Sequence, residues 1–278
     1  MAETLRLAML GGGQMGEAII SGLIAKGTFS PGSIVVSEPV EKKREDIAQR
    51  FGVKVTGDNA QAAEGADLVF LAMKPQTLQS ALSSINGRIK KDAALVSIVA
   101  GASIETLASG SAHKNVVRIM PNTPARIGRG VSVWTCSPGF PESKLSIVKS
   151  ILDAMGEEIR VHDESSLDQV TALSGSGPAY VFLFIEALID AGVAIGLPRD
   201  MAHKLASLTV SGSAEYLIKS GEHPAILKNQ VTSPGGTTAA GLYCLERENL
   251  RAAVADAVFA AYERSRELGK GVAAHKPD

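Results

Sequence analysis

A turn late in the chain combines residue types that can hold a small anion. The stretch Val231–Leu242 reads Val-Thr-Ser-Pro-Gly-Gly-Thr-Thr-Ala-Ala-Gly-Leu, and it interrupts residues that otherwise favour helix. A helix that starts after this turn leaves its first main-chain N–H groups without helical partners. Together with the threonine hydroxyls, these N–H groups can bind a carboxylate at the positive end of the helix. The alternative is an ordinary helix start that Ser233 or Thr237 caps.

A second candidate site lies near the amino terminus, in a glycine-rich stretch. Gly11, Gly13 and Gly16 satisfy the spacing G-x-G-x-x-G, after a strand-like run at Leu5–Leu10 and before a run with helical spacing. This arrangement predicts a dinucleotide site, in which a tight turn brings the pyrophosphate to the N-terminus of a helix. An ordinary glycine turn is the alternative, and the flanking strand and helix favour the dinucleotide.

The residues after the second predicted strand bear on the choice between NAD and NADP. Glu38 stands where an acidic residue, about 20 positions beyond the last glycine, usually binds the ribose hydroxyls of NAD. Ser37 and the basic cluster Lys42–Arg44 suit the 2′-phosphate of NADP instead. The two signals conflict, and the sequence leaves both interpretations open.

Further candidates follow the later strands, because ligands of an open parallel sheet bind beyond the carboxyl ends of its strands. Ala72–Pro75 follows the fourth predicted strand, and Val99–Gly101 follows the fifth. Lys74 is either a cofactor contact or a surface charge beside a proline that starts a helix. Asn59 follows the third strand, where we expect it to cap a helix; contact with adenosine is the alternative.

The rest of the chain offers no obvious catalytic acid or base. Its five histidines have no metal-ligand spacing, so we expect no metal. Leu173–Pro178 looks superficially like a nucleophile elbow but follows no strand, which argues against a hydrolase. Reduction of a ketone needs a proton donor, whereas a protonated imine accepts hydride directly and mainly requires positioning. The sequence therefore favours an imine as the substrate.

Alternating strands and helices must position the first group of candidates. Apolar runs at Leu5–Leu10, Ile34–Ser37, Val53–Val55, Leu68–Ala72, Ala94–Val99, Val116–Met120, Val131–Trp134 and Glu158–Val161 predict strands, separated by helical stretches. Beyond them we expect only helices, at Leu167–Gly192, Arg199–Ser220, Pro224–Asn229, Thr237–Arg247 and Asn249–Gly269. The predicted fold class is α/β: a Rossmann-type, doubly wound, mostly parallel sheet in residues 1–164, followed by an all-helical domain in residues 165–278.

Composition narrows the class of protein. The 278 residues carry a formal charge of −1 with both signs spread along the chain, which predicts no nucleic-acid partner. Cys136 and Cys244 have no metal or redox spacing, which is typical of a reducing compartment. The most apolar stretch, Ala179–Leu197, contains Glu186 and Asp190, so we expect no membrane span. Without a recognisable signal or transit segment, the predicted location is the cytoplasm.

Three blocks in the same order resemble the signatures of pyrroline-5-carboxylate reductases. They are the Gly11–Gly16 loop, Leu173–Tyr180 (Leu-Ser-Gly-Ser-Gly-Pro-Ala-Tyr) and the Val231–Leu242 turn. Met120–Pro124 is similar to the connection within the family's first domain, and the resemblance covers essentially the whole chain. It implies the last step of proline biosynthesis, in which hydride from NAD(P)H reduces 1-pyrroline-5-carboxylate to L-proline.

The resemblance also implies cofactor, assembly and site residues. NADPH is preferred, NADH is a second possibility, and helices of two subunits complete each site in a homodimer, which some members assemble into a larger ring such as a decamer. Cofactor contacts are implied at Leu10, Gly11, Gly12, Gly13, Gln14, Met15, Gly16, Ser37, Asn59, Ala72, Met73, Lys74, Pro75, Val99, Ala100 and Gln230. Many relatives carry Asn where this chain has Gln230. Substrate contacts are implied at Glu222, Ser233, Gly236, Thr237 and Thr238, with the catalytic Thr238 hydroxyl bonding the ring nitrogen.

Two other functions fit part of the sequence. A dehydrogenase of small hydroxy acids has the same two-domain plan but needs a catalytic lysine on the first long helix of its second domain. The predicted helix Leu167–Gly192 contains no lysine. A redox sensor that binds NADPH without catalysis would explain the glycine loop but gives no reason for the turn at Ser233–Thr238.

Overall fold

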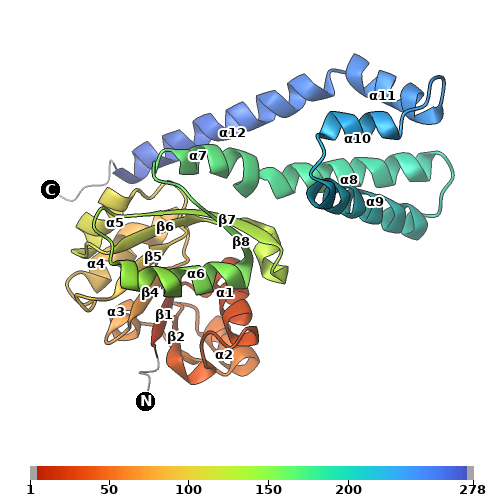
Figure 1. Ribbon diagram of the computed structural model, residues 1–278. Helices are drawn as coiled ribbons and strands as arrows, with labels where there is room; N and C mark the ends of the chain where they lie inside the picture. The colour runs from red at the N-terminus through yellow and green to blue at the C-terminus, as the bar shows by residue number, and fades with distance from the viewer. Residues whose placement is uncertain (1–4, 274–278) are drawn as a thin grey trace. The chain divides into compact units, whose positions relative to one another are not determined.

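The chain folds into two compact units. The structure is a computed structural model that describes residues 5–273 (Figure 1). The first unit comprises the residues up to Ser176 together with those from Ala261 onward, and the second comprises Gly177–Ala260. The predicted division into a cofactor domain, 1–164, and a substrate domain, 165–278, concerns function and stays a prediction.

The first unit is built on one eight-stranded sheet in the order β3-β2-β1-β4-β5-β6-β7-β8 among the described residues. Its strands are β1 (Leu7–Leu10), β2 (Ile34–Ser37), β3 (Lys54–Thr56), β4 (Leu68–Leu71), β5 (Ala94–Ser97), β6 (Val116–Met120), β7 (Gly130–Cys136) and β8 (Gly156–Arg160). Neighbouring strands are parallel except β6 and β7, which are antiparallel. The predicted doubly wound, mostly parallel sheet is thereby confirmed, and its chain reversal lies between β1 and β4.

Helices cover both faces of this sheet (Figure 1). Residues of α1 (Gln14–Ala25), α2 (Glu41–Phe51) and α6 (Leu145–Met155) share one apolar core with the strands, and those of α3 (Asn59–Ala63), α4 (Leu78–Ile85) and α5 (Ile104–Ser111) share the other. Short 3-10 helices lie at Pro31–Ser33, Pro75–Thr77, Thr123–Ile127 and Glu142–Lys144. Strands covered on both faces have no polar side, which explains their continuous apolar runs.

Two segments of the first unit lead to and from the helical unit. After β8 come α7 (Ser166–Val170) and a π-helical turn (Thr171–Gly175), where the sequence predicted uninterrupted helix. The last helix, α12 (Leu250–Ala273), returns to the first unit from Ala261 onward. There the Ser265 hydroxyl donates a 2.7 Å hydrogen bond to the Asp168 carboxylate, which ties α12 to α7.

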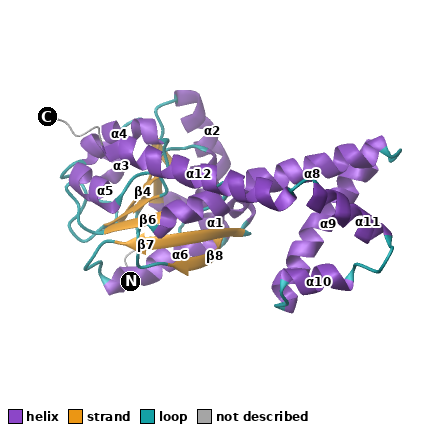
Figure 2. Cartoon of the chain, turned by 90° about the horizontal axis from the view of Figure 1, so that it is seen from above, coloured by secondary structure: helices purple, strands orange, loops and turns teal. Residues whose placement is uncertain are grey.

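The described residues of the second unit form only helices and loops, as predicted (Figure 2). They are α8 (Gly177–Ala194), α9 (Arg199–Ser220), α10 (Pro224–Gln230), α11 (Thr237–Arg247) and the first part of α12. Ile189 of α8 packs against Ala202 and Ala206 of α9 in a small buried cluster. By length and composition, the helical run Ser166–Ala194, which comprises α7, the π-helical turn and α8, is apolar enough to cross a membrane, although it carries Glu186 and Asp190.

Candidate functional site

The glycine loop joins the carboxyl ends of three neighbouring strands. The Gly11 N–H donates to the Ser37 carbonyl over 2.8 Å, and the Ala72 N–H donates to the Leu10 carbonyl over 2.8 Å. Gly11 has φ +106°, and a Cβ atom there would lie 2.6 Å from the Ala72 carbonyl oxygen. Only glycine fits this position, because the backbone of the β4 loop occupies the space that a side chain would take.

The start of α1 fits a pyrophosphate. Gly13 is the N-cap of α1 and no side-chain hydrogen bond caps the helix, so its first N–H groups stay available. A Cβ atom on Gly13 would meet no other atom of the described chain within 4 Å. Gly16, by contrast, packs directly on the Gly11 carbonyl. Open space beside Gly13 and uncapped N–H groups of α1, at the point where the strand order reverses, suit a dinucleotide phosphate.

The loop after β2 is held by its own acidic residue. The buried Glu38 carboxylate accepts the Gly12 N–H and the Val40 N–H, each over 3.1 Å. The Arg44 guanidinium donates to the carbonyls of Glu38 and Pro39, over 2.8 and 2.9 Å. Glu38 thus links the glycine loop to the loop after β2. Arg44, from the basic cluster Lys42–Arg44, also bonds the loop after β2.

Asn59 does not cap a helix, and that prediction is wrong. Asp58 is the N-cap of α3, and its carboxylate accepts the N–H groups of Ala60 and Gln61. Asp58 is the capping residue because it precedes the first helical residue, and from that position a carboxylate reaches those N–H groups. The Asn59 side-chain amide oxygen, Oδ1, instead accepts a 2.7 Å hydrogen bond from the Ser37 hydroxyl. Two predicted cofactor residues therefore meet beside the end of β2.

The ends of β4 and β5 carry the other predicted cofactor contacts of this unit. Ala72, Met73 and Pro75 are partly buried, whereas Lys74 is exposed and its carbonyl accepts hydrogen bonds from Thr77. After β5, the buried Ser97 hydroxyl accepts the Val99 N–H over 3.2 Å. The other predicted cofactor residues lie close to these. Leu10 ends β1, Gly12 lies in the glycine loop, Gln14 and Met15 begin α1, and Ala100 follows Val99.

In the second unit, the predicted substrate turn leads directly into α11. Gly236 is the N-cap, α11 has no side-chain cap, and the Gly236 N–H donates to the Ser233 carbonyl over 3.1 Å. Neither Ser233 nor Thr237 caps the helix, so the interpretation of this turn as a capped helix start is wrong. Thr237 and Thr238 are exposed in the first turn of α11. Their N–H groups and hydroxyls are available to an anion.

The candidate residues thus form two groups in separate units. The glycine loop and the ends of β2, β4 and β5 lie together in the first unit. The substrate turn, Glu222 before α10 and Gln230 at the end of α10 belong to the second, where both side chains are exposed. The sequence analysis did not predict two features: the hydrogen bond from the Gly12 N–H to Glu38, and an ion pair between Arg118 and Glu164. Arg118 in the apolar strand Val116–Met120 was the available signal, because a buried charge requires a partner.

A doubly wound sheet with an uncapped glycine loop at its switch point defines the class of dinucleotide-dependent oxidoreductases. Two family models match. One, described as pyrroline-5-carboxylate reductase dimerisation, covers residues 164–268; the other, described as NADP oxidoreductase, coenzyme F420-dependent, covers residues 6–101.

Full-length relatives define the family. The pyrroline-5-carboxylate reductase of Synechocystis sp. is 44% identical over 267 residues, which are 96% of this chain and 99% of that protein. That of Arabidopsis thaliana is 42% identical over 269 residues, 97% of each chain. The crystal structure of Plasmodium falciparum pyrroline carboxylate reductase with NADP bound has a TM-score of 0.88 at 33% identity and covers 96% of this chain and 99% of its own. This chain belongs to the pyrroline-5-carboxylate reductase family, as predicted.

Proposed function

We propose that this chain reduces 1-pyrroline-5-carboxylate to L-proline, the final step of proline biosynthesis. The reaction moves a hydride from reduced nicotinamide to the imine carbon, and the protonated ring nitrogen becomes the amine without a further proton donor. The observation that carries the proposal is that a member of this family has two helix starts without a side-chain cap. One is the start of α1 after the glycine loop, and the other is the threonine-rich start of α11. The relatives give no support to a hydroxy-acid dehydrogenase or a sensor without catalysis.

The substrate carboxylate binds at the start of α11. The N–H groups of Thr237 and Thr238 and the positive end of the helix attract the anion, while Ser233 and Gly236 shape the turn. The Thr238 hydroxyl bonds the ring nitrogen and orients the imine carbon. Its exposure, and the lack of a hydrogen-bond partner for it among the described residues, support this role. We assign Glu222 to the same substrate site by the family resemblance.

NADPH is the preferred reductant, with NADH as a second substrate. The cofactor lies along the residues from Leu10 to Gly16 and the ends of β2, β4 and β5; Gln230 is its contact from the helical unit. Glu38 is already engaged with two N–H groups, and Arg44 lies at the same corner, which suits a 2′-phosphate better than a free diol. The NADP in the Plasmodium falciparum relative supports the same choice.

A homodimer completes the site, and dimers assemble further into a ring such as a decamer. The match of residues 164–268 to a dimerisation family supports the first step, as do the exposed apolar side chains of α8. We place the enzyme in the cytoplasm. A formal charge of −1 with both signs spread along the chain argues against a nucleic-acid partner, and Glu186 and Asp190 within the apolar helix α8 argue against a membrane partner.

The decisive experiment follows the loss of reduced-nicotinamide absorbance when purified protein meets 1-pyrroline-5-carboxylate, with NADPH and NADH in parallel. The proposal expects proline as the product and a higher kcat/KM with NADPH. Binding of NADPH without turnover would replace the proposal by the sensor, and turnover of a hydroxy acid would replace it by the dehydrogenase.

A further inference from the structure

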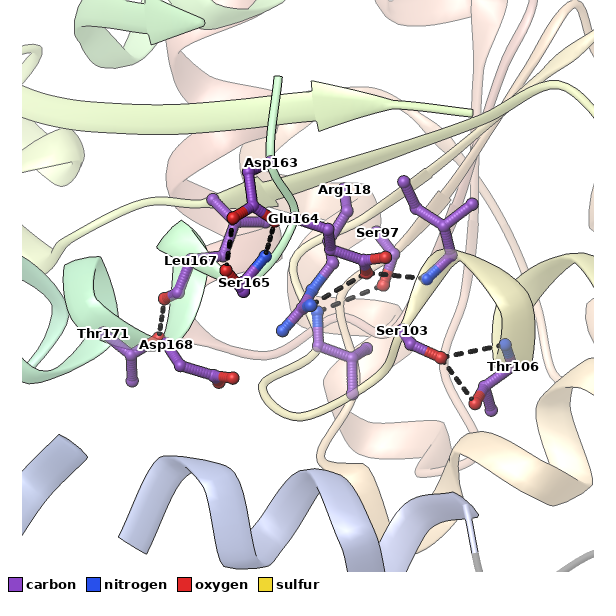
Figure 3. A network of polar contacts seen from close by, with 12 residues as sticks. Ser97, Ser103, Thr106, Arg118, Asp163, Glu164, Ser165, Leu167, Asp168 and Thr171 are labelled. Carbon is purple, nitrogen blue, oxygen red and sulfur yellow. Dashed lines mark hydrogen bonds and ion pairs between the residues drawn. The ribbon is translucent and has the colours of Figure 1, made fainter. Parts of the chain in front are cut away.

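The loop after β5 is fastened by a residue that lies 60 positions away in sequence. The Glu164 carboxylate accepts the Ile104 N–H, at the start of α5, over 2.7 Å. The same oxygen, Oε1, accepts a 2.9 Å hydrogen bond from the Arg118 guanidinium (Figure 3). One carboxylate oxygen thus joins the segment after β8, the β6 strand and the end of the loop that runs from Val99 to Ser103.

The charges make this contact strong. Arg118 is only 5% exposed, and Glu164 is its ion-pair partner among the described residues. The Arg118 Nε has no hydrogen-bond partner there, so Glu164 supplies the compensation for a buried positive charge. Glu164 also places a negative charge at the positive end of α5, where Ser103 caps the helix by accepting the Thr106 N–H over 3.1 Å.

The same loop is fastened at two further points. Ala100 packs against the buried apolar cluster of Met120, Val133 and Leu167, the last from α7. Gly101 has φ +75°, and a Cβ atom there would lie 3.0 Å from the Gly269 main-chain nitrogen in α12. The loop backbone is therefore held by α7, by α12 and by Glu164.

The position of the loop in the sheet tells which part of a dinucleotide it faces. The pyrophosphate cradle lies at β1, and the ribose corner of Ser37 and Glu38 lies at β2. A dinucleotide spans the switch point, so its nicotinamide half extends from β1 to the opposite side, over β4 and β5. Val99 and Ala100 lie in the loop just after β5, which ends at Ser97.

We infer that Glu164 is a positioning residue: by holding the Ile104 N–H it fixes the β5–α5 loop against the nicotinamide half of NADPH. The inference rests on the proposed cofactor. It gives Glu164 and Arg118 different roles. Glu164 bonds the loop backbone itself, whereas the Arg118 guanidinium is bonded only to Glu164 among the described residues. Loss of Glu164 therefore loosens the loop, and loss of Arg118 leaves the Ile104 contact in place.

The test compares the affinity for NADPH with that for 2′-phospho-ADP-ribose, which lacks the nicotinamide, by calorimetric titration. Glu164→Ala raises the Kd for NADPH about 10-fold, as expected for loss of one charge-assisted hydrogen bond, and changes that for the fragment less than about 2-fold. Glu164→Gln keeps an acceptor oxygen and restores most of the affinity. Asp163→Asn is the matched control, because Asp163 is an exposed neighbour whose carboxylate bonds only Ser165 among the described residues.

A second pair of variants separates positioning from stability. Arg118→Met leaves the ratio of the two Kd values unchanged. The double variant Arg118→Met, Glu164→Ala removes the unpaired buried charge and so has a higher Tm than Glu164→Ala, yet it keeps the raised ratio. An unchanged ratio in a folded double variant would overturn the inference, as would an equal rise in Arg118→Met. Turnover is measured separately: wild-type protein that binds NADPH but does not reduce the imine defeats the proposed function, and the Kd ratio still decides the role of Glu164.

Discussion

Replacement of Gly13 by alanine separates binding from folding at the glycine loop. Gly13 has φ −79° and ψ 177°, an extended conformation that alanine adopts without strain. The added methyl group would meet no atom of the described chain within 4 Å. The methyl group would occupy open space at the N-cap of α1, where we expect the pyrophosphate to bind. We therefore expect a folded protein with an obstructed phosphate cradle.

The magnitudes follow from these two facts. Gly→Ala at a compatible position stabilises by about 0.4–1 kcal/mol through the unfolded state, and the poorer N-cap offsets part of this gain. Stability thus stays within about 1 kcal/mol of wild type. A methyl group that displaces the pyrophosphate from one charge-assisted N–H bond costs about 1.5–3 kcal/mol, or roughly 10- to 150-fold in the Kd for NADPH.

The assay pairs thermal unfolding with titration of NADPH. Gly32→Ala is the control, because its added methyl group also meets no atom. Gly32 precedes β2 and so lies at the amino ends of the parallel strands, whereas the glycine loop lies at their carboxyl ends. Gly16→Ala gives the contrasting result, a lower Tm, because its methyl group collides with the Gly11 carbonyl. If Gly13→Ala kept the wild-type Kd and Tm, the pyrophosphate would not bind at this helix start and the assignment would be refuted.

Variants at three further places test other parts of the molecule. Thr238→Ala lowers kcat about 10- to 1000-fold, because the protonated ring nitrogen loses the positioned hydroxyl that accepts its hydrogen bond, while Thr238→Ser retains the hydroxyl and most of the rate; full activity of the folded alanine variant would remove Thr238 from the mechanism. Alanine at all three positions of the basic cluster Lys42–Arg44 raises KM for NADPH more than for NADH, and equal increases would exclude a role in phosphate binding. Gly101→Ala forces a side chain into φ +75° against Gly269, so we expect about 1–3 kcal/mol of lost stability; an unchanged Tm in thermal unfolding would contradict the close contact.

The sheet could be predicted because buried parallel strands leave an unambiguous mark. Residues such as Leu68–Leu71 are apolar at every position, since helices cover both faces. The π-helical turn at Thr171–Gly175 could not be predicted. One inserted residue changes the i→i+4 bonds to i→i+5 without altering composition, as in the 2.8 Å bond from the Ser176 N–H to the Thr171 carbonyl.

The phosphate cradle could be predicted because its glycines are required by main-chain geometry, which a short motif encodes. The role of Glu38 could not, because the same residue type serves either as a ribose ligand or as a partner of the Gly12 N–H. The contacts of Glu164 could not be predicted for another reason. Its partners Ile104 and Arg118 lie 60 and 46 positions away, and only the folded sheet brings them together.

Apolar residues make up 45% of the chain, yet the helical unit buries few of its own. Within the described residues Gly177–Ala260, the buried apolar side chains are Ile189, Ala202 and Ala206. Large apolar side chains there are exposed instead, with Phe182 at 64% and Leu183 at 68% on α8. At about 25 cal/mol per Å² of apolar surface, leaving such a face in water forfeits several kcal/mol. A second copy of the chain removes that cost, which is why we expect the unit that carries Thr238 to be stable only as a dimer.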